Sequence, residues 1–368
     1  MTRIGIDVYS ALHFPRGMGI YTINFLKALA MIDKENIYIL YSNIQDEENI
    51  LPKEKNFIFK QLKAKGQFHY EQFVLPKECK KDKIEILHSP ANTSPIFLSK
   101  KIKRILTLHD IIFLKKEIPL PNNKKQLLGR LYYALTTILN SKRADIILTP
   151  SEYSKNDIAH TLFINKNKIV VDTRGAEHFD ISEATALNVL KKKYNIPDSY
   201  YFTLGGEAPS KNTEFLLEIF SNKNDKNLVV AGVKDLENSI FYNKYKNYSN
   251  IVFVPYISQE DIVGLYKNAE AFIFPSIYEG FGLPLLEAMK CECPIICANT
   301  SCLSEVAGGT ALYFNPKDKT QLLNQINNLI ENNALKNELI EKGKKRLNNY
   351  SWMNTAIIIK GVYNYYVS

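Results

Sequence analysis

The sequence has no apolar run of membrane-spanning length, and it holds only five cysteines and one tryptophan in 368 residues. Because a helix needs about 20 apolar residues to cross a bilayer, we expect no spanning helix. Asp7 and Pro15 stand where a signal peptide would keep its apolar core, so we expect no export signal. A small, odd number of cysteines is typical of reduced thiols, which favours a cytoplasmic protein.

Basic residues are unevenly distributed along the chain. The net charge is +9, and the first 180 residues carry all of it, with 28 Lys and Arg against 19 Asp and Glu. A basic face drawn to anionic lipid on the inner side of the plasma membrane, or to a lipid diphosphate acceptor, would explain this excess. A lysine-rich solvated surface explains it equally well. No nucleic-acid-binding module is visible, so nucleic acid is not expected as a partner.

The length favours two domains, because 368 residues exceed what one hydrophobic core usually serves. Strand-like apolar runs alternate with helical patterns, which predicts an α/β fold of doubly wound parallel sheets. The predicted strands span 3–8, 37–41, 84–87, 105–108, 145–148, 200–204, 228–231, 251–254, 271–274 and 295–297. The predicted helices span 20–31, 124–140, 151–162, 213–220, 258–267 and 284–289, with further helices over 319–346 and from 351 on.

One stretch, residues 271–287 (AFIFPSIYEGFGLPLLE), combines a strand, a glycine loop and a helix. Gly280 and Gly282 lack Cβ atoms, so the backbone there can approach a ligand closely. Pro284 is suited to the first turn of the helix that follows. A helix N-terminus presents free N–H groups and partial positive charge, which suits a phosphate.

Two glutamates flank this loop. Ionised carboxylates only accept hydrogen bonds, so beside a phosphate site Glu279 and Glu287 should face hydroxyls, as in a ribose diol or a sugar ring. Taken singly, Glu279 reads as a solvated loop acid and Glu287 as a first-turn acid that matches the helix dipole. The joint pattern favours ligand binding.

The segment 275–316 closely resembles the donor-site signature of the family-4 retaining glycosyltransferases, whose fold is GT-B. The two glutamates separated by seven residues carry the resemblance, together with the strand-like run 294–297 and the segments SEVAG (304–308) and ALYFNP (311–316). The resemblance implies that Glu287 binds the ribose diol of a nucleotide diphosphate sugar. It further implies that Glu279 and the loop backbone hold the sugar and the departing phosphate; this loop comprises Gly280, Phe281, Gly282 and Leu283.

The resemblance also implies the domain layout. We expect a Rossmann-like acceptor-side domain at 1–180, a Rossmann-like donor domain at 181–349, and a last helix at 350–368 that crosses back to the first domain, with a deep cleft between the domains. The irregular segment 172–183 falls where the family has its linker.

Three positions in the first half carry smaller signals. Gly17 and Gly19 lie between a strand and a helix, and from local residues alone they read as a tight loop that needs positive φ. In the family the matching loop lies near the donor diphosphate. His109 ends a predicted strand and resembles a family histidine that faces the donor sugar, where neutral imidazole would hydrogen-bond a hydroxyl. For His88 a structural role is favoured.

The loop after the first strand of the second half, GGEAPSKN (205–212), resembles the segment that holds the donor diphosphate. Lys211 matches the family lysine. The family arginine is absent, because its two usual positions hold Gly206 and Ser210. A lysine is not equivalent to an arginine fork on a diphosphate. Either Arg16, Arg174 or backbone N–H groups compensate for the missing arginine, or stabilisation of the leaving group is weakened. Gly206 itself would approach the donor through its backbone.

Other chemistries are not expected. No two aspartates are separated by a single residue, so the metal-binding pair of the other major glycosyltransferase fold is missing, and no H-E-x-x-H motif occurs. The four cysteines between 291 and 302 lack the paired spacing of a zinc site and read as buried thiols. We expect no metal and no cofactor.

The sequence therefore predicts a retaining hexosyltransferase of bacterial surface polysaccharide synthesis, such as O-antigen or capsule. The start of the chain and the PSKN loop resemble a branch rich in mannosyltransferases, which favours GDP-mannose and leaves UDP- and dTDP-sugars open. The acceptor would be a glycan or lipid-linked saccharide. The alternatives are a GT-B sugar-nucleotide epimerase or hydrolase, and a non-catalytic basic protein that binds a membrane surface.

Overall fold

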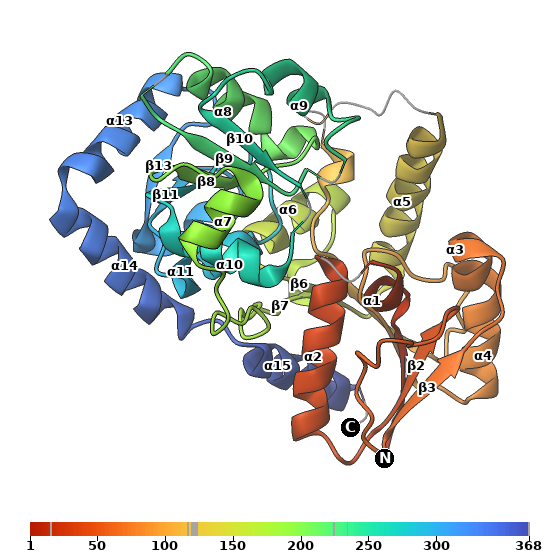
Figure 1. The fold of residues 1–368 in the computed structure, drawn as a ribbon. Helices are drawn as coiled ribbons and strands as arrows, with labels where there is room; N and C mark the ends of the chain where they lie inside the picture. The colour runs from red at the N-terminus through yellow and green to blue at the C-terminus, as the bar shows by residue number, and fades with distance from the viewer. Residues whose placement is uncertain are drawn as a thin grey trace. The chain divides into compact units, whose positions relative to one another are not determined.

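Two parallel sheets organise the chain, each in a unit of its own (Figure 1). The computed structural model describes residues 1–14, 17–115, 118, 124–223, 225–233, 235–255 and 257–366. One unit comprises Met1–Gly175 together with Ser351–Ser368, and the other comprises Ala176–Tyr350. No helix in the described ranges is long and apolar enough to span a membrane.

The first unit contains a seven-stranded parallel sheet with the order β3-β2-β1-β4-β5-β6-β7. Its strands are β1 (Arg3–Asp7), β2 (Ile37–Ser42), β3 (Phe57–Gln61), β4 (Ile86–Ser89), β5 (Lys103–Thr107), β6 (Ile146–Thr149) and β7 (Ile169–Val171). Its helices are α1 (Tyr9–His13), α2 (Met18–Ile32), α3 (Gly66–His69), the π-helical η1 (Tyr70–Val74), α4 (Leu75–Lys81), η2 (Ile112–Leu114), α5 (Lys124–Arg143), α6 (Glu152–Leu162), η3 (Lys166–Lys168) and α15 (Trp352–Tyr365).

The second unit contains a six-stranded parallel sheet with the order β10-β9-β8-β11-β12-β13. Its strands are β8 (Tyr201–Leu204), β9 (Leu228–Ala231), β10 (Ile251–Val254), β11 (Ala271–Phe274), β12 (Ile295–Ala298) and β13 (Ala311–Phe314). Its helices are α7 (Leu187–Tyr194), η4 (Pro209–Lys211), α8 (Thr213–Phe220), α9 (Ile240–Tyr245), α10 (Gln259–Asn268), α11 (Leu283–Lys290), α12 (Leu303–Ala307), η5 (Gly308–Thr310), α13 (Lys319–Glu331) and α14 (Asn333–Leu347).

Central strands such as β9, β11 and β12 are buried along their whole length, which explains why they are continuous apolar runs rather than alternating ones. Helix starts follow side-chain caps, because the hydroxyls of Ser151, Ser258 and Ser351 each accept a hydrogen bond from a backbone N–H in the first turn. All five cysteines are buried and unpaired, which confirms the prediction of structural thiols.

The α/β prediction is confirmed, and the limits of β9, β10, β11 and α8 agree with the expected ones. The expectation of a simple glycine loop after the first strand is wrong, because the short helix α1 lies between β1 and the glycines. The strands β3, β7 and β13 were not predicted. All three are edge strands with partly exposed side chains; β3 (FIFKQ) ends in polar residues, and β7 (IVV) is only three residues long.

The C-terminal helix α15 belongs to the first unit and lies against α2 (Figure 1). Trp352 and Tyr363 of α15 join Phe25 of α2 in one buried cluster. The Tyr363 hydroxyl lies 2.7 Å from Nδ1 of His88, and Nε2 of His88 lies 2.8 Å from the Thr107 hydroxyl. Burial lowers the pKa of His88 to about 3, so this imidazole is neutral and structural, as expected.

A buried ion pair follows β7. Arg174 donates to the Asp172 carboxylate at 2.8 Å, and its guanidinium lies 3.6 Å above the ring centre of Tyr21. The Tyr21 hydroxyl donates to the same carboxylate at 2.6 Å. Arg174 is therefore engaged within the first unit, where it holds the end of the sheet against α2.

We expect Arg174→Met to destabilise the first unit by about 3–5 kcal/mol, because it leaves the Asp172 carboxylate buried without its cation. The measurement is urea unfolding followed by the fluorescence of Trp352, which is the only tryptophan of the chain and lies in this unit. Adding Asp172→Asn should restore much of the loss. A single variant as stable as the parent would contradict the role of the pair.

Candidate functional site

The order of strands reverses beside β8 in the second unit. From β8 the chain proceeds to β9 and β10 on one side, whereas β11, β12 and β13 occupy the other side. Ligands of open parallel sheets bind at the carboxyl ends of the two strands where the order reverses. The loop after β8 carries Lys211, and the loop after β11 carries Glu279. The topology therefore brings these two predicted residues together.

Lys211 and Glu279 form an ion pair, with Nζ 2.8 Å from the carboxylate oxygen Oε1. Nζ of Lys211 also lies 5.4 Å from the ring centre of Phe274, the last residue of β11. Both side chains remain partly accessible, with 34% of the lysine side chain and 17% of the glutamate side chain exposed. A ligand can therefore reach both charges.

Hydrogen bonds hold the two loops in place. The N–H of Ile277, after β11, donates to the carbonyl of Ser210, after β8, at 2.8 Å, and the N–H of Glu279 donates at 3.1 Å to the hydroxyl of Ser301, which follows β12. Around Gly206, the hydroxyl of Thr213 accepts from the backbone N–H at 3.0 Å and donates to the carbonyl at 2.8 Å. Lys211 and Glu279 therefore extend from loops whose backbone is held in place by hydrogen bonds.

The glycine turn leads directly into α11. Gly282 has φ +92°, a conformation that favours glycine, and a Cβ there would lie 3.0 Å from a terminal methyl group of Leu303, which would have to shift slightly. Leu283 starts α11 with Gly282 as its N-cap, and the first N–H groups of any helix have no partner inside it. Phe281 is buried, with its ring centre 5.6 Å from that of Tyr350, so its side chain serves the core.

Glu287 lies in the second turn of α11, not in the first turn as expected, and the first turn holds no acidic residue. A dipole-matched surface acid is therefore a poor description of it. The Tyr266 hydroxyl donates to Oε2 of Glu287 at 3.3 Å. Burial raises the pKa of Glu287 to about 7, while that hydrogen bond and the nearby charge of Lys211 act in the opposite direction. The charge of Lys211 thus acts on both glutamates.

No arginine accompanies this lysine from its own loop. Of the two positions that the family arginine usually takes, one holds the buried Ser210 and the other holds Gly206. Arg174 is held by Asp172 in the first unit, and Arg16 lies outside the described residues.

His109 follows β5 in the first unit. Its Nε2 lies 2.8 Å from the carbonyl oxygen of Pro90, and because a carbonyl only accepts, Nε2 carries the proton. Nδ1 is then the acceptor, and Arg174 lies 3.5 Å away from it. Burial, reinforced by the charge of Arg174, lowers the pKa of His109 to about 3. The ring is a neutral hydrogen-bonding group and a poor general base near neutrality.

The two N-terminal glycines differ from each other. Gly17 has φ +49° and open space around its Cβ position, so its conformation requires glycine. Gly19 lies inside α2, where a Cβ would overlap the carbonyl oxygen of Phe14. Close contact between α2 and the end of α1 therefore explains Gly19 without a ligand.

The first sheet reverses its strand order between β1 and β4, and a small pocket of about 30 Å³ lies there. Asp7 and Ser10 line it from the side of β1, and Thr93 lines it from the side of β4. The Ser10 hydroxyl is buried and has no hydrogen-bond partner among the described residues. The sequence did not single out these residues, although an aspartate that ends the first strand of a parallel sheet is a usable signal.

A second carboxylate also lines this pocket. Glu71 accepts hydrogen bonds from Gln72, Tyr132 and Thr93. Burial raises the pKa of Glu71 to about 7 and that of Asp7 to about 6. The two acids and the unpaired hydroxyl offer hydrogen bonds to a small polar group, such as one hydroxyl of a larger ligand.

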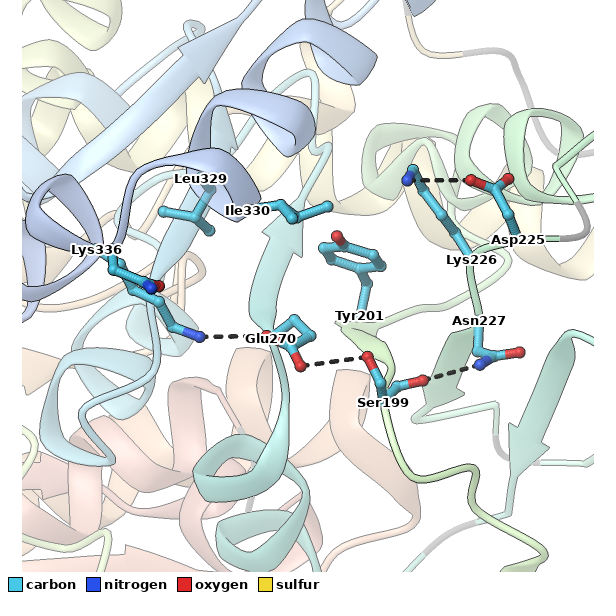
Figure 2. A pocket seen from close by; sticks show the side chains of 10 residues that line it. Ser199, Tyr201, Asp225, Lys226, Asn227, Glu270, Leu329, Ile330 and Lys336 are labelled. Atoms are coloured by element: carbon cyan, nitrogen blue, oxygen red, sulfur yellow. Dashed lines mark hydrogen bonds and ion pairs between the residues drawn. The ribbon is translucent and has the colours of Figure 1, made fainter.

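A larger pocket, of about 260 Å³, lies at the opposite edge of the second sheet (Figure 2). Ser199 precedes β8, and Glu270 precedes β11, so this pocket is at the amino ends of the strands that carry the candidate site at their other ends. Its charged side chains pair with each other, Lys226 with Asp225 and Lys336 with Glu270. Among the described residues, the charged side chains that line this pocket are therefore already paired with each other.

Family models match most of the chain. The model described as Glycosyltransferase Family 4 matches residues 15–176, and the model described as Glycosyl transferases group 1 matches residues 189–346. The second match contains Lys211, Glu279 and Glu287.

Several curated relatives are named mannosyltransferases. O-antigen chain mannosyltransferase B of Escherichia coli is 27% identical over 281 residues, which cover 73% of this chain and 71% of the relative. Serotype-specific mannosyltransferase WbdA of Escherichia coli is 27% identical over 271 residues, which cover 69% of this chain and 32% of WbdA. The chain thus spans about a third of the length of WbdA.

Solved structures with the same fold cover nearly the whole chain. A glycosyltransferase from Rickettsia africae superposes with a TM-score of 0.75 at 19% identity, covering 100% of this chain and 99% of that one. Anabaena HepE in complex with UDP-glucose superposes with a TM-score of 0.70 at 13% identity, covering 99% of this chain and 100% of that one. With two parallel-sheet units, two consecutive family matches and glutamates at both signature positions, the chain belongs to the family-4 glycosyltransferases of the GT-B fold.

Proposed function

We propose that this glycosyltransferase moves mannose from GDP-mannose to a glycan or lipid-linked saccharide of a bacterial surface polysaccharide, with retention at the anomeric carbon. The pairing of Lys211 with Glu279 beside the N-terminus of α11 carries the proposal, because it joins a cation, an acceptor and helix N–H groups at one strand-order reversal. The names of the mannosyltransferase relatives support the sugar, and HepE with UDP-glucose supports a nucleotide-sugar donor.

Each group has one task in this proposal. Glu287 accepts hydrogen bonds from the ribose diol, and Glu279 with the backbone of Gly280–Leu283 holds the sugar. Lys211 leaves its ion pair for the diphosphate and, with the α11 N-terminus, stabilises the negative charge that builds up on the leaving group. Gly17 and Gly206 would let backbone approach the diphosphate.

The acceptor side of the proposal uses the first unit. His109 would hydrogen-bond a sugar hydroxyl through Nδ1, which would have to exchange its 3.5 Å contact with Arg174 for the hydroxyl. The pocket of Asp7 and Ser10 would take an acceptor hydroxyl. In the family, retention is usually explained by front-face attack, in which the leaving phosphate takes the acceptor proton. That route needs no protein nucleophile and no metal.

Transfer from GDP-mannose to lipid-linked acceptors, followed by NMR of the anomeric proton in the product, tests the reaction. We expect the product to keep the donor's anomeric configuration, and we expect slower transfer from UDP- or dTDP-sugars. An inverted product would contradict retention. Donor cleavage at the same rate without acceptor would instead identify a hydrolase.

We expect Lys211→Ala to lower kcat/KM by about 100- to 1,000-fold, because it removes the cation that meets the leaving diphosphate. The matched control is Lys226→Ala, which removes a lysine of the same unit that lies at the amino edge of the sheet (Figure 2). The control should retain the parental rate. Equal activity of the two variants would place the phosphate site elsewhere.

We expect Glu287→Gln to weaken donor binding by about ten-fold or more, since it removes a charged acceptor. The same change should stabilise the free protein at high pH. Because the pKa of Glu287 is raised to about 7, the folded state holds this proton more tightly than the unfolded state, and the resulting stability is lost as pH rises towards 7.

Calorimetry with GDP-mannose and melting curves at pH 5 and 8 check both effects. The gain in melting temperature over the parent should grow from pH 5 to pH 8, corresponding to about 1–3 kcal/mol at the higher pH. Glu331→Gln, at the exposed end of α13, removes the same charge at the surface and should change neither property. Unaltered donor affinity in Glu287→Gln would exclude the diol role.

A further inference from the structure

The pocket at the strand-order reversal of the first sheet contains an unused acceptor and an unused hydroxyl. Oδ1 of Asp7 accepts hydrogen bonds from the backbone N–H of Tyr9 at 3.0 Å and from the Tyr70 hydroxyl at 2.9 Å. Oδ2 of Asp7 has no hydrogen-bond partner among the described residues. Ser10 lines the same pocket and is 5% exposed, and its hydroxyl has no partner there either. Because buried polar groups almost always have partners, these two groups indicate a position for a ligand.

The second acid of the pocket is already well supplied with donors. Oε1 of Glu71 accepts from the amide of Gln72 at 2.7 Å and from the Tyr132 hydroxyl at 3.1 Å. Oε2 accepts from the Thr93 hydroxyl at 2.7 Å. Glu71 therefore gives the pocket its charge, whereas Oδ2 of Asp7 is the acceptor that remains for a ligand.

The two unused groups together match a hydroxyl. A carboxylate oxygen only accepts hydrogen bonds, whereas a serine hydroxyl both donates and accepts. A sugar hydroxyl can donate to Oδ2 of Asp7 while it accepts from Ser10, so it satisfies both groups. A carboxylate or phosphate of a ligand would bring further acceptors to Oδ2, and an ammonium group would leave the donor of Ser10 unused.

The charge of the pocket opposes anions. Asp7 and Glu71 line it, and among the described residues no lysine, arginine or histidine does. The pocket thus has the opposite sign from the first 180 residues as a whole, which carry the net charge of +9. An anionic ligand group would therefore meet like charge at short range. The volume of about 30 Å³ has room for roughly one or two hydroxyl groups, so the rest of a sugar would lie at the mouth.

Aromatic rings offer a surface for the rest of the sugar. Tyr9, Phe14 and Tyr133 line the pocket, and Phe14 is 61% exposed. The ring of Tyr9 is held from two sides, because it stacks on His13 at 3.9 Å between centroids and lies 5.4 Å from the ring of Tyr70. Aromatic walls with a few placed polar groups are typical of small-molecule sites.

We propose that this pocket binds the terminal sugar of the acceptor and selects a neutral saccharide over uronates and phosphorylated sugars, with Asp7 as the residue that determines the selection. Asp7 and Ser10 bind a hydroxyl of that sugar, and Glu71 adds to the repulsion of anions. The inference rests on the proposed function, because it names the class of acceptor for that enzyme. Its test measures binding rather than transfer, so that the two can fail separately.

Titration of the full chain without donor, followed by ligand-observed NMR, compares methyl α-mannoside with methyl α-mannosiduronate. The two probes differ only at C6, where the second carries a carboxylate. At pH 8 both acids of the pocket are largely ionised, because burial raises the pKa of Asp7 to about 6 and that of Glu71 to about 7. We expect the uronate to bind about ten-fold or more weakly than the neutral probe.

Equal binding of the two probes, or no detectable binding of either, would overturn the proposal. Binding of the neutral probe by a protein that transfers no sugar would contradict the proposed function and still support this pocket.

Two variants locate the binding in the pocket. Ser10→Ala should bind methyl α-mannoside about five-fold or more weakly, because one hydrogen bond to the ligand is lost. Its melting temperature should equal or exceed that of the parent, since the hydroxyl has no partner to lose in the free protein. Asp7→Asn keeps an oxygen for Tyr9 and Tyr70 and places an amide donor at Oδ2, so the uronate should bind at least as well as the neutral probe.

The matched controls are Ser141→Ala and Asp33→Asn, which remove a buried hydroxyl and a buried charge of the same unit away from the pocket. Both should keep the parental preference between the probes, and both should melt at a lower temperature because they lose hydrogen bonds. Parental affinity for methyl α-mannoside in Ser10→Ala would overturn the proposal. So would an Asp7→Asn variant that still rejects the uronate.

Discussion

The reversal of strand order beside a central strand is the constraint on which both units depend. In each sheet the chain leaves two neighbouring strands towards opposite sides, β1 and β4 in one and β8 and β11 in the other. The loops that follow such a pair must diverge, and polar side chains gather between them. Asp7 and Ser10 gather in the first sheet, and Lys211 and Glu279 gather in the second.

Electrostatic balance in the second unit follows from this placement. Lys211 serves two carboxylates, because it pairs with Glu279 and its charge also favours the ionised form of Glu287. Without a ligand, one lysine is too little for two acids, and burial raises the pKa of Glu287 to about 7. A ligand rich in hydroxyls would supply the missing donors, which is the general reason why a binding site is a locally destabilised part of a fold.

Prediction from the sequence worked best where the secondary structure and the candidate binding residues lie in one continuous segment. The strand, glycine turn and helix of 271–290 could be predicted because the apolar run, the positive-φ glycine and the proline are local signals. The burial of the Phe281 ring could not be predicted, since its partner Tyr350 is far away in the chain. The pocket at Asp7 could not be predicted either, because its walls come from segments that are far apart in the sequence: α1, η1 and the segment after β4.

Two predictions about helices were incomplete, because they depended on helix boundaries and on contacts between distant residues. The first-turn assignment of Glu287 failed because α11 starts at Leu283, one residue before the proline that was expected to open it. The helix prediction for 124–140 was right in type, yet periodicity alone could not tell which face is buried. Hydrogen bonds of Thr137 and Asn140 to distant carbonyls decide that.

The burial of every cysteine has a practical consequence. The five thiols lie inside the two units, and burial raises the pKa values of all of them above the ordinary range, so none should react quickly with alkylating reagents. A single cysteine introduced at a chosen surface position can therefore carry a maleimide fluorophore in the native background, which opens the enzyme to site-specific spectroscopy without first removing its own sulfur atoms.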